Sequence, residues 1–301
     1  MLMPNASEQQ ISVFANAKSR RGGESFQRAL DLLKAAGVAV GESQLYRDPG
    51  ALDKRVGEAV KKGARLVVVG GGDGTLSMVA KHFVKSESTL GVLPLGTGNA
   101  FARDLSIMSL EKACETIAKG SDQRIDLGHA VNDYFVNVIT AGLTARIASE
   151  LNDDAKKRFG RAVYLFAMAR GLSLVKAFHA KLTMVEETLE FDTLQIVIGN
   201  GRYHAGPFPL SPDASITEGK LSGYAMATTN RASFLKLAWK LRTGRQCDLP
   251  EVYSIWTEGG KLETWPARKV VVDGEISNRT PIEFKVVPKA ISVRVPEEFK
   301  G

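Results

Sequence analysis

The sequence predicts a protein of two domains, a doubly wound α/β domain followed by a domain of mostly antiparallel strands packed as a β-sandwich. Strand and helix patterns alternate over about the first 125 residues, as in βαβ units with helices on both faces of a parallel sheet. After about Arg124, short apolar runs separated by turn signals replace this alternation, which is typical of antiparallel sandwiches. A glycine-rich corner also joins the apolar run Val67–Val69 directly to a helical pattern.

The first domain is expected to contain four parallel strands with helices between them. The expected strands cover residues 11–16, 38–46, 64–70 and 89–96, and the expected helices cover residues 24–36, 50–62, 75–84, 100–104 and 110–119. The run Val67–Val69 suits a strand that is buried on both faces. We place the domain boundary after residue 127, with the last strand of the chain as a candidate to return to the first domain.

The second domain, residues 128–301, is expected to begin with a hairpin and a helical stretch. The hairpin covers residues 125–140 and turns at Asn132 and Asp133. The helical stretch covers about residues 144–179, and further strands lie within residues 180–200, 219–228, 267–276 and 281–295. Asp273 and Gly274 form a second strong turn signal, because Asp-Gly between β-branched runs favours a tight hairpin.

Composition and charge limit the class of protein. With 44% hydrophobic and 24% charged residues among 301, the chain has the composition of a globular protein with a sizeable core. Cys114 and Cys247 lie far apart without metal-binding spacing, which favours a reducing compartment. The start of the sequence lacks a signal-peptide pattern and no apolar run approaches the ~20 residues of a membrane span, so we expect a cytoplasmic protein. The net charge of +7 allows anionic partners, but no nucleic-acid-binding motif is present and we expect no nucleic acid partner.

Three loops that follow strands carry unusual chemistry. Because parallel strands joined by right-handed crossovers end at the same edge of a sheet, these loops open on one edge. The loops supply Asn16, Lys18, Ser19, Arg20 and Arg21 after the first strand, Gly70–Thr75 after the third strand, and Leu95–Ala100 after the fourth. Glycines let backbone N–H groups approach a ligand closely, helix N-termini add positive potential, and Lys18 and Arg20 add positive charge. The three loops therefore predict a phosphate-binding site.

Asp73 lies in the second of these loops, where phosphate groups would repel its carboxylate. A hydrated Mg²⁺ held partly by Asp73 and partly by phosphate oxygens would remove that repulsion. The alternative is that Asp73 caps the helix that begins near Thr75. The run GGGDGT matches neither the P-loop motif nor the dinucleotide-binding glycine motif, so a P-loop ATPase and a dinucleotide dehydrogenase are both disfavoured.

The second and third loops also resemble a known family. The segments GGDGTLSMVA and GVLPLGTGNAFARDL look like the catalytic domain of diacylglycerol kinases, a family that includes soluble bacterial lipid kinases and the sphingosine and ceramide kinases. NAD kinases share GGDGT but lack the loop that follows here. The similarity covers nearly the whole chain, since it extends to YFVNVITAGLTARIA, to residues 199–224, to VVVDGE and to PKAISVRVP. It implies that the first domain is Rossmann-like, of the NAD kinase and diacylglycerol kinase type.

The resemblance implies ATP-dependent phosphorylation of a lipid hydroxyl, with Mg²⁺, in a cleft between the two domains. The implied nucleotide contacts are Gly71, Gly72, Asp73, Gly74, Thr75, Leu76, Ser77 and Thr97, with Asn16, Lys18 and Asn99 as supporting contacts. The catalytic carboxylates it implies are Asp73 and one in the DGE stretch, where Glu275 is favoured as proton acceptor and Asp273 is the alternative. An alcohol that attacks a γ-phosphoryl group must lose its proton, so a positioned carboxylate suits the chemistry.

A second, structural Mg²⁺ site is implied by some members of the family, in which an aspartate and nearby backbone carbonyl groups hold the ion. In this sequence Glu218 stands in place of that aspartate, and Ser215 and Lys220 would contribute carbonyl oxygens. Because the extra methylene of glutamate moves its oxygens, the sequence does not decide whether this metal site is present.

A lipid substrate requires contact with a membrane surface. The segment Arg231–Arg245 places Phe234, Trp239 and other apolar residues near one face of a helix with basic residues around them, which suits an interfacial helix on anionic lipid. Residues 153–178 are a second candidate. The alternative for each segment is a helix that packs its apolar face on the sheet of the second domain. We expect a peripherally membrane-associated protein, and a homodimer stays open.

Two other functions stay open on the sequence. An NAD kinase-like small-molecule kinase would use the same phosphate-binding loops, and a non-catalytic nucleotide- or lipid-binding module would use them without turnover. The presence of both Asp73 and Glu275 disfavours the module. The favoured function is an ATP-dependent kinase that acts on diacylglycerol or a related lipid in phospholipid metabolism.

Overall fold

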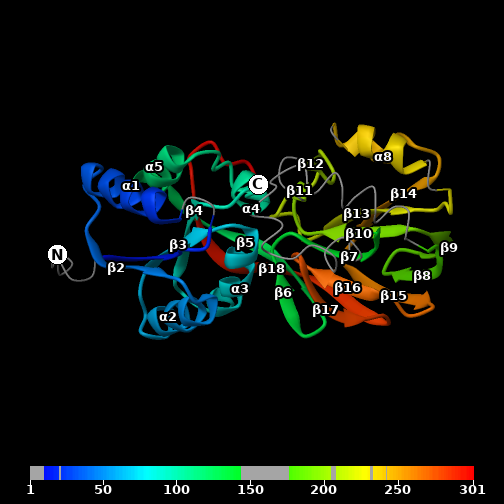
Figure 1. Cartoon of the computed structure of the whole chain (residues 1–301), viewed down its shortest axis with the longest axis horizontal. Helices are drawn as coiled ribbons and strands as arrows, with labels where there is room; N and C mark the ends of the chain where they lie inside the picture. The colour runs from blue at the N-terminus through cyan, green and yellow to red at the C-terminus, as the bar shows by residue number, and fades with distance from the viewer. Residues whose placement is uncertain (1–9, 20–21, 144–175, 205–207, 231–232, 242) are drawn as a thin grey trace. The chain divides into compact units, whose positions relative to one another are not determined.

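The computed structural model of the chain describes residues 10–19, 22–143, 176–204, 208–230, 233–241 and 243–301 (Figure 1). The chain divides into two units by its internal contacts. Unit 1 comprises Met1–Leu127 together with Pro288–Gly301, and unit 2 comprises Gly128–Val287.

Unit 1 is built around a parallel sheet with the strand order β2-β1-β3-β4. Its strands are β1 (Ile11–Asn16), β2 (Val40–Tyr46), β3 (Leu66–Gly71) and β4 (Thr89–Pro94), and its helices are α1 (Gly22–Ala35), α2 (Pro49–Lys61), α3 (Asp73–Ala80), α4 (Ala100–Asp104) and α5 (Leu110–Lys119), with a short 3₁₀ turn, η2 (Lys81–Phe83), after α3. Helices α1 and α5 lie on one side of the sheet and α2 and α3 on the other (Figure 1). The predicted doubly wound α/β fold is confirmed.

Local sequence explains where these elements begin and why β3 is central. Every residue of β3 is buried, as expected for an apolar strand covered by helices on both faces. Asp48 caps α2 by accepting hydrogen bonds from the N–H groups of Gly50 and Ala51, and Pro49 occupies the first turn, where no N–H is needed. Ser109 caps α5 by accepting a hydrogen bond from the Lys112 N–H.

Unit 2 is a sandwich of two antiparallel sheets. Its elements are β6 (Asp133–Phe135), β7 (Val138–Gly142), β8 (Phe178–Met184), β9 (Thr188–Thr193), β10 (Gln195–Gly199), β11 (Tyr203–His204), β12 (Phe208–Pro209), β13 (Leu221–Met226), α8 (Ser233–Leu241), η3 (Gln246–Asp248), β14 (Val252–Thr257), β15 (Gly259–Trp265), β16 (Lys269–Val272) and β17 (Glu275–Arg279). One sheet has the order β14-β13-β10-β7-β16-β17, and the other contains β9, β8 and β15. Alternate residues of both sheets, such as Ile139 and Ile196 from one and Leu182 and Phe284 from the other, meet in one buried core. The predicted sandwich is therefore confirmed.

Two strands belong to both units. β5 (Ser121–Ala130) leads from unit 1 into unit 2, and β18 (Ile282–Val295) leads back. The first part of β18 pairs antiparallel with β15, whereas Ser292 and Val293 pair parallel with β4. At the change of partner, Lys289 has a positive φ of 51°, and its N–H donates to the buried carboxylate of Asp126 at 2.7 Å.

Two of the predicted boundaries are wrong. The hairpin between β5 and β6 turns at Val131 and Asn132, not at Asn132 and Asp133, because Ala130 pairs with Asp133 and both turn residues have positive φ. Val131 accepts this conformation because its side chain packs against the sandwich core. The predicted helical stretch does not reach His179, since β8 begins at Phe178 and alternates buried and exposed residues from there. Residues 144–175 of that stretch lie outside the described residues.

Candidate functional site

The loops that follow β3 and β4 touch each other at their glycines. The N–H of Leu95 donates to the carbonyl of Gly71 at 2.9 Å. A Cβ atom on Gly96 would lie 2.4 Å from the Cα of Gly72 and 2.7 Å from Oδ1 of Asn99, which no side chain tolerates. Gly96 is therefore required by the close approach of the two backbones, whereas a Cβ on Gly72, 3.2 Å from the Cα of Gly96, would only crowd it. This contact fixes the loops side by side at the carboxyl edge of the sheet.

Two asparagines hold the loops in shape. Asn16, at the end of β1, donates from Nδ2 to the hydroxyl of Thr75 at 3.1 Å and accepts a hydrogen bond from the Lys18 N–H at 2.9 Å. Asn99 adopts the left-handed conformation, accepts from the Gly96 N–H at 2.9 Å and donates to the Gly96 carbonyl at 3.1 Å. Both amides are used within the loops, so their contribution to a ligand site is positioning.

Asp73 connects the β3 loop with the helix that follows β4. Its Oδ1 accepts a hydrogen bond from the Phe101 N–H in the first turn of α4, at 3.0 Å. Helix α3 begins at Asp73 itself, with Gly72 as a cap that makes no side-chain hydrogen bond, so the alternative that Asp73 caps a helix starting near Thr75 is wrong. The second carboxylate oxygen of Asp73 makes no hydrogen bond or ion pair within the part of the chain that the structure describes.

The space beside Asp73 is open. A Cβ on Gly74 would meet no atom within 4 Å, in contrast to Gly71, Gly72 and Gly96. Lys18, Gly74 and Thr97, one from each of the three loops, are exposed. Thr75 and Leu76 are buried, at 9% and 0% exposure, and the N–H groups of both donate to the Gly72 carbonyl. Ser77 is half-buried.

This arrangement fits a polyphosphate and a divalent cation. Backbone N–H groups at the start of α3 and at the β4 loop can face anionic oxygens, and the positive end of the helix dipole favours them. The second oxygen of Asp73 is an oxygen ligand of the kind that Mg²⁺ prefers, and the opening at Gly74 leaves room for phosphate groups next to it.

In unit 2, the DGE stretch forms a two-residue hairpin turn between β16 and β17. Val272 pairs with Glu275, and the two residues between them, Asp273 and Gly274, have positive φ angles of 45° and 94°. The turn predicted from Asp-Gly is confirmed.

The two carboxylates of this turn have different environments. Asp273 accepts three backbone hydrogen bonds, at 2.8 Å from Val136 and at 3.0 Å and 2.8 Å from Asn137 and Val138, and its own N–H donates to the Val138 carbonyl. Glu275 is exposed, and its carboxylate makes no hydrogen bond or ion pair with other described residues. Asp273 therefore fixes the turn to the start of β7, and Glu275 is the carboxylate that is available to a ligand.

With this geometry established, comparisons with known proteins identify the family. Residues 10–130 match the family described as the diacylglycerol kinase catalytic domain. Residues 137–295 match the family described as the YegS C-terminal NAD kinase beta sandwich-like domain. The chain belongs to the diacylglycerol kinase catalytic-domain family. The two matches together cover both units. The resemblance to diacylglycerol kinases that the two glycine loops indicated is therefore confirmed.

Individual relatives agree with the family. A protein of Pseudomonas syringae pathovar tomato named "probable lipid kinase YegS-like" is 34% identical over 257 residues, which are 84% of this chain and 83% of that protein. An uncharacterised Synechocystis protein is 28% identical over 243 residues, and the match spans 56% of its length. The crystal structure of a diacylglycerol kinase from Bacillus anthracis superposes with a TM-score of 0.76 at 20% identity, covering 97% of this chain and 98% of that one. This last likeness shows the shared fold.

The implied structural metal site of the family lies on the loop before β13. Ala214 and Ile216 are buried and anchor this loop, while Glu218 is exposed. The hydroxyl of Ser215 lies 2.8 Å from that of Thr217, and Lys220 directly precedes β13. Within the described parts of the chain, no three His, Cys, Asp or Glu side chains gather as a metal cluster. A site formed by the Glu218 carboxylate with the carbonyl oxygens of Ser215 and Lys220 stays a prediction.

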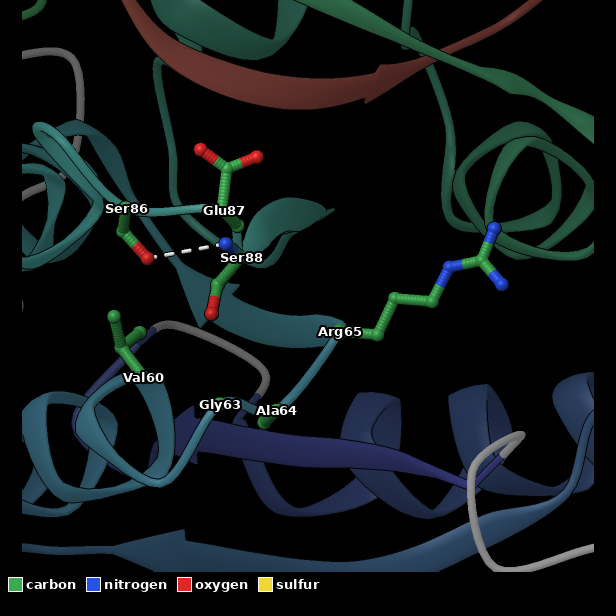
Figure 2. Close-up of a pocket in the computed structure, with 7 residues that line it drawn as sticks. All are labelled: Val60, Gly63, Ala64, Arg65, Ser86, Glu87 and Ser88. Carbon is green, nitrogen blue, oxygen red and sulfur yellow. Dashed lines mark hydrogen bonds between the residues drawn. The ribbon is translucent and has the colours of Figure 1, made fainter. Parts of the chain in front are cut away.

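A cavity elsewhere in unit 1 is not part of the family site. It has a volume of about 270 Å³ and is lined by Val60, Gly63, Ala64, Arg65, Ser86, Glu87 and Ser88 (Figure 2). These residues precede β3 and β4, so the cavity lies at the amino ends of the strands, at the edge opposite to the glycine loops. The Arg65 side chain extends away from the other lining residues (Figure 2).

Sequence reasoning missed the backbone partners of both aspartates. The Phe101 N–H that holds Asp73 and the Val136–Val138 N–H groups that hold Asp273 carry no side-chain signal. The similarity of the FVN run at residues 135–137 to the family pattern was the available clue, but it gave no role to the backbone.

Of the helices within the described residues, none is both long and apolar enough to cross a bilayer.

Proposed function

We propose that this protein transfers the γ-phosphoryl group of ATP to the hydroxyl of a lipid, with Mg²⁺ as the cofactor. The observation that supports this most is the start of α3, where Gly74 has open space beside it and the preceding Asp73 keeps one carboxylate oxygen without a partner among the described residues. Family membership supports phosphoryl transfer, and the printed name of the Pseudomonas relative supports a lipid as acceptor.

In unit 1, the chain's own residues bind and orient the nucleotide. Backbone N–H groups of Asp73, Gly74 and Thr97 would donate to phosphate oxygens, while the N–H groups of Thr75 and Gly96 hold the loops in shape. Lys18 would add a positive charge. Asp73 would hold the cation through its second oxygen, while its first oxygen stays on the Phe101 N–H. When bound, Mg²⁺ would supply charge neutralisation for the phosphate groups. Preorganised donors of this kind lower the barrier because they need no rearrangement during the reaction.

In unit 2, we assign proton acceptance to Glu275 and positioning to Asp273. The acceptor hydroxyl loses its proton to Oε of Glu275 as its oxygen bonds to the γ-phosphorus, and the bond to the β-phosphate oxygen breaks. Asp273 cannot take that proton without losing hydrogen bonds, because its two oxygens already accept three N–H groups. Its role is to aim the turn that carries Glu275.

The substitution Glu275→Gln tests this assignment. Because glutamine keeps the size of the side chain but cannot accept a proton, we expect kcat to fall by about 10²- to 10⁴-fold with an unchanged melting temperature. The measurement is ATP consumption with dispersed diacylglycerol or another lipid, beside a binding assay for Mg·ATP, which should be unaffected.

Asp273→Asn is the matched comparison. An asparagine amide would place N–H groups against the Val136 N–H, so we expect a loss of about 2 kcal/mol of stability together with the loss of activity. Full activity of Glu275→Gln would contradict the role of Glu275. Turnover with NAD and none with any lipid would replace the proposal by an NAD kinase-like function.

A further inference from the structure

Helix α8, in unit 2, buries one face and exposes another. Ser233 and Leu237, one turn apart, are 6% and 1% exposed. Leu237 and Leu241 pack into a cluster with Tyr224 and other residues of the six-stranded sheet. The alternative considered for this segment, a helix that packs apolar residues on the sheet, therefore describes the face that carries Leu237 and Leu241.

The outward face of α8 is not explained by that packing. Lys236, Trp239 and Lys240 stand at positions i, i+3 and i+4, which lie together along a helix. Trp239 is 72% exposed, the joint highest value among the large hydrophobic residues that the structure describes, and Lys236 is exposed beside it.

The charge around this face is positive. The sequence from Arg231 to Arg245 contains five basic residues and no acidic residue. Two acidic residues contact this segment. Glu251 accepts a hydrogen bond from the hydroxyl of Ser233, on the buried face of α8, at 3.2 Å. Asp248 has its Oδ2 3.3 Å from Nζ of Lys240 and 2.8 Å from Nε of Arg245. The hydrogen bond from Lys240 is the main reason that the pKa of Asp248 is lowered. One carboxylate shared by two cations leaves the outward face with a net positive charge.

A tryptophan between lysines suits the boundary between water and lipid. The indole ring has a large apolar surface and one polar N–H, so it is stabilised where one side is apolar and the other wet. Lysine side chains beside it can keep their charged ends in the headgroup layer while their alkyl chains follow the ring inward. An anionic surface adds electrostatic attraction to the buried apolar area.

We propose that the outward face of α8, formed by Lys236, Trp239 and Lys240, docks on an anionic lipid bilayer. The inference rests on the proposed function in one respect, because a lipid kinase must reach an acceptor that is part of a membrane. The binding surface itself is argued from the exposure of Trp239 and the surrounding charge.

The test measures binding of the full chain to vesicles by flotation, without nucleotide. We expect binding to vesicles of phosphatidylcholine with about 30% phosphatidylglycerol and weaker binding to phosphatidylcholine alone. Trp239→Ala should weaken binding to the anionic vesicles by about tenfold. Trp265→Ala is the matched control, because Trp265 is 53% exposed but lies on β15, and it should bind as the unchanged chain does.

A second pair of variants tests the charge. Lys236→Gln should weaken binding to the anionic vesicles about threefold and leave binding to phosphatidylcholine unchanged. Lys285→Gln, at an exposed lysine of β18, is its control and should have no effect. All four variants change exposed side chains, and their thermal unfolding should match that of the unchanged chain.

Three results would overturn the inference. These are equal vesicle binding by Trp239→Ala and the unchanged chain, no vesicle binding by the unchanged chain, and a Trp239→Ala effect on oligomeric state in sedimentation, which would make the face a contact between two copies.

Activity on lipid in detergent micelles separates this inference from the proposed function. If micellar activity persists while Trp239→Ala has no effect on vesicles, only the docking fails; if vesicle binding depends on Trp239 but no lipid is phosphorylated, only the kinase activity fails.

Discussion

The glycines of the two loops fall into two groups by what surrounds them. At Gly71, Gly72 and Gly96, an added Cβ would meet atoms of the chain itself, the closest at 2.5, 3.2 and 2.4 Å. At Gly74 it would meet nothing within 4 Å. An added Cβ would overlap the chain itself at Gly71 and Gly96 and would crowd it at Gly72, whereas the folded chain leaves room for a side chain at Gly74.

Gly74→Ala therefore separates folding from ligand binding. Alanine fits the helical backbone, so we expect an unchanged or slightly higher melting temperature, while the methyl group enters the space of the phosphates and weakens Mg·ATP binding by at least about tenfold. Calorimetry of ATP binding and thermal unfolding measure the two effects. Gly23→Ala is the matched control, since Gly23 also has no atom within 4 Å and lies in α1, away from the loops.

Gly96→Ala gives the opposite comparison, because its Cβ would overlap backbone atoms of Gly72 and cost stability. Unchanged ATP affinity in Gly74→Ala would show that phosphates do not occupy the opening.

At the scale of elements, helix α5 carries a buried thiol that links its packing to pH. Cys114 is 2% exposed, its Sγ lies 3.7 Å from the Ala29 carbonyl of α1, and burial raises its pKa to about 11, with a smaller contribution from Glu111. In the unfolded chain the pKa of the thiol lies near its ordinary value of 9.0. The unfolded state therefore loses this proton first as the pH rises.

The protonated thiol contributes its full amount to the free energy of unfolding below about pH 9. This contribution is lost between about pH 9 and 11, so that the free energy of unfolding is lower by about 2 kcal/mol at the upper end. Cys114→Ser cannot ionise in this range, so its free energy of unfolding should fall less steeply over the same interval. Urea unfolding of both chains at several pH values measures the difference. If the free energy of unfolding falls equally with pH in both chains, the raised pKa of Cys114 is contradicted.

The sequence was sufficient for elements whose signals are local. Strands β1, β3 and β4 end at glycine or polar runs, and their bounds agree with the predicted ranges to within two residues. The β5–β6 turn was displaced by one residue because burial of Val131, a tertiary effect, overrides local turn preference. The division of roles between Asp273 and Glu275 was out of reach, because the partners of Asp273 lie up to 137 residues earlier in the chain.

At the scale of the whole molecule, β18 contributes to the cores of both units. Ile282 and Phe284 are buried in the sandwich core, whereas Ile291 and Val293 are 0% exposed in unit 1, where the strand pairs with β4. Two isoleucine-to-alanine substitutions in this one strand should therefore each weaken a different unit.

Ile291→Ala should cost about 3 kcal/mol and speed amide hydrogen exchange in β3 and β4, because it leaves a cavity in unit 1. Ile282→Ala should instead speed exchange in β15 and β8. Hydrogen exchange read by mass spectrometry resolves these segments. Identical exchange patterns for the two variants would show that the units do not unfold separately.

The passage of β5 out of unit 1 and of β18 back into it has a consequence for synthesis on the ribosome. Unit 2 is inserted into the chain of unit 1, so the sheet of unit 1 is completed only after the segment Pro288–Gly301 has been synthesised. A nascent chain halted before this segment holds a finished sandwich beside a sheet with β4 unpaired on one side. The order of assembly is then the reverse of the order of translation.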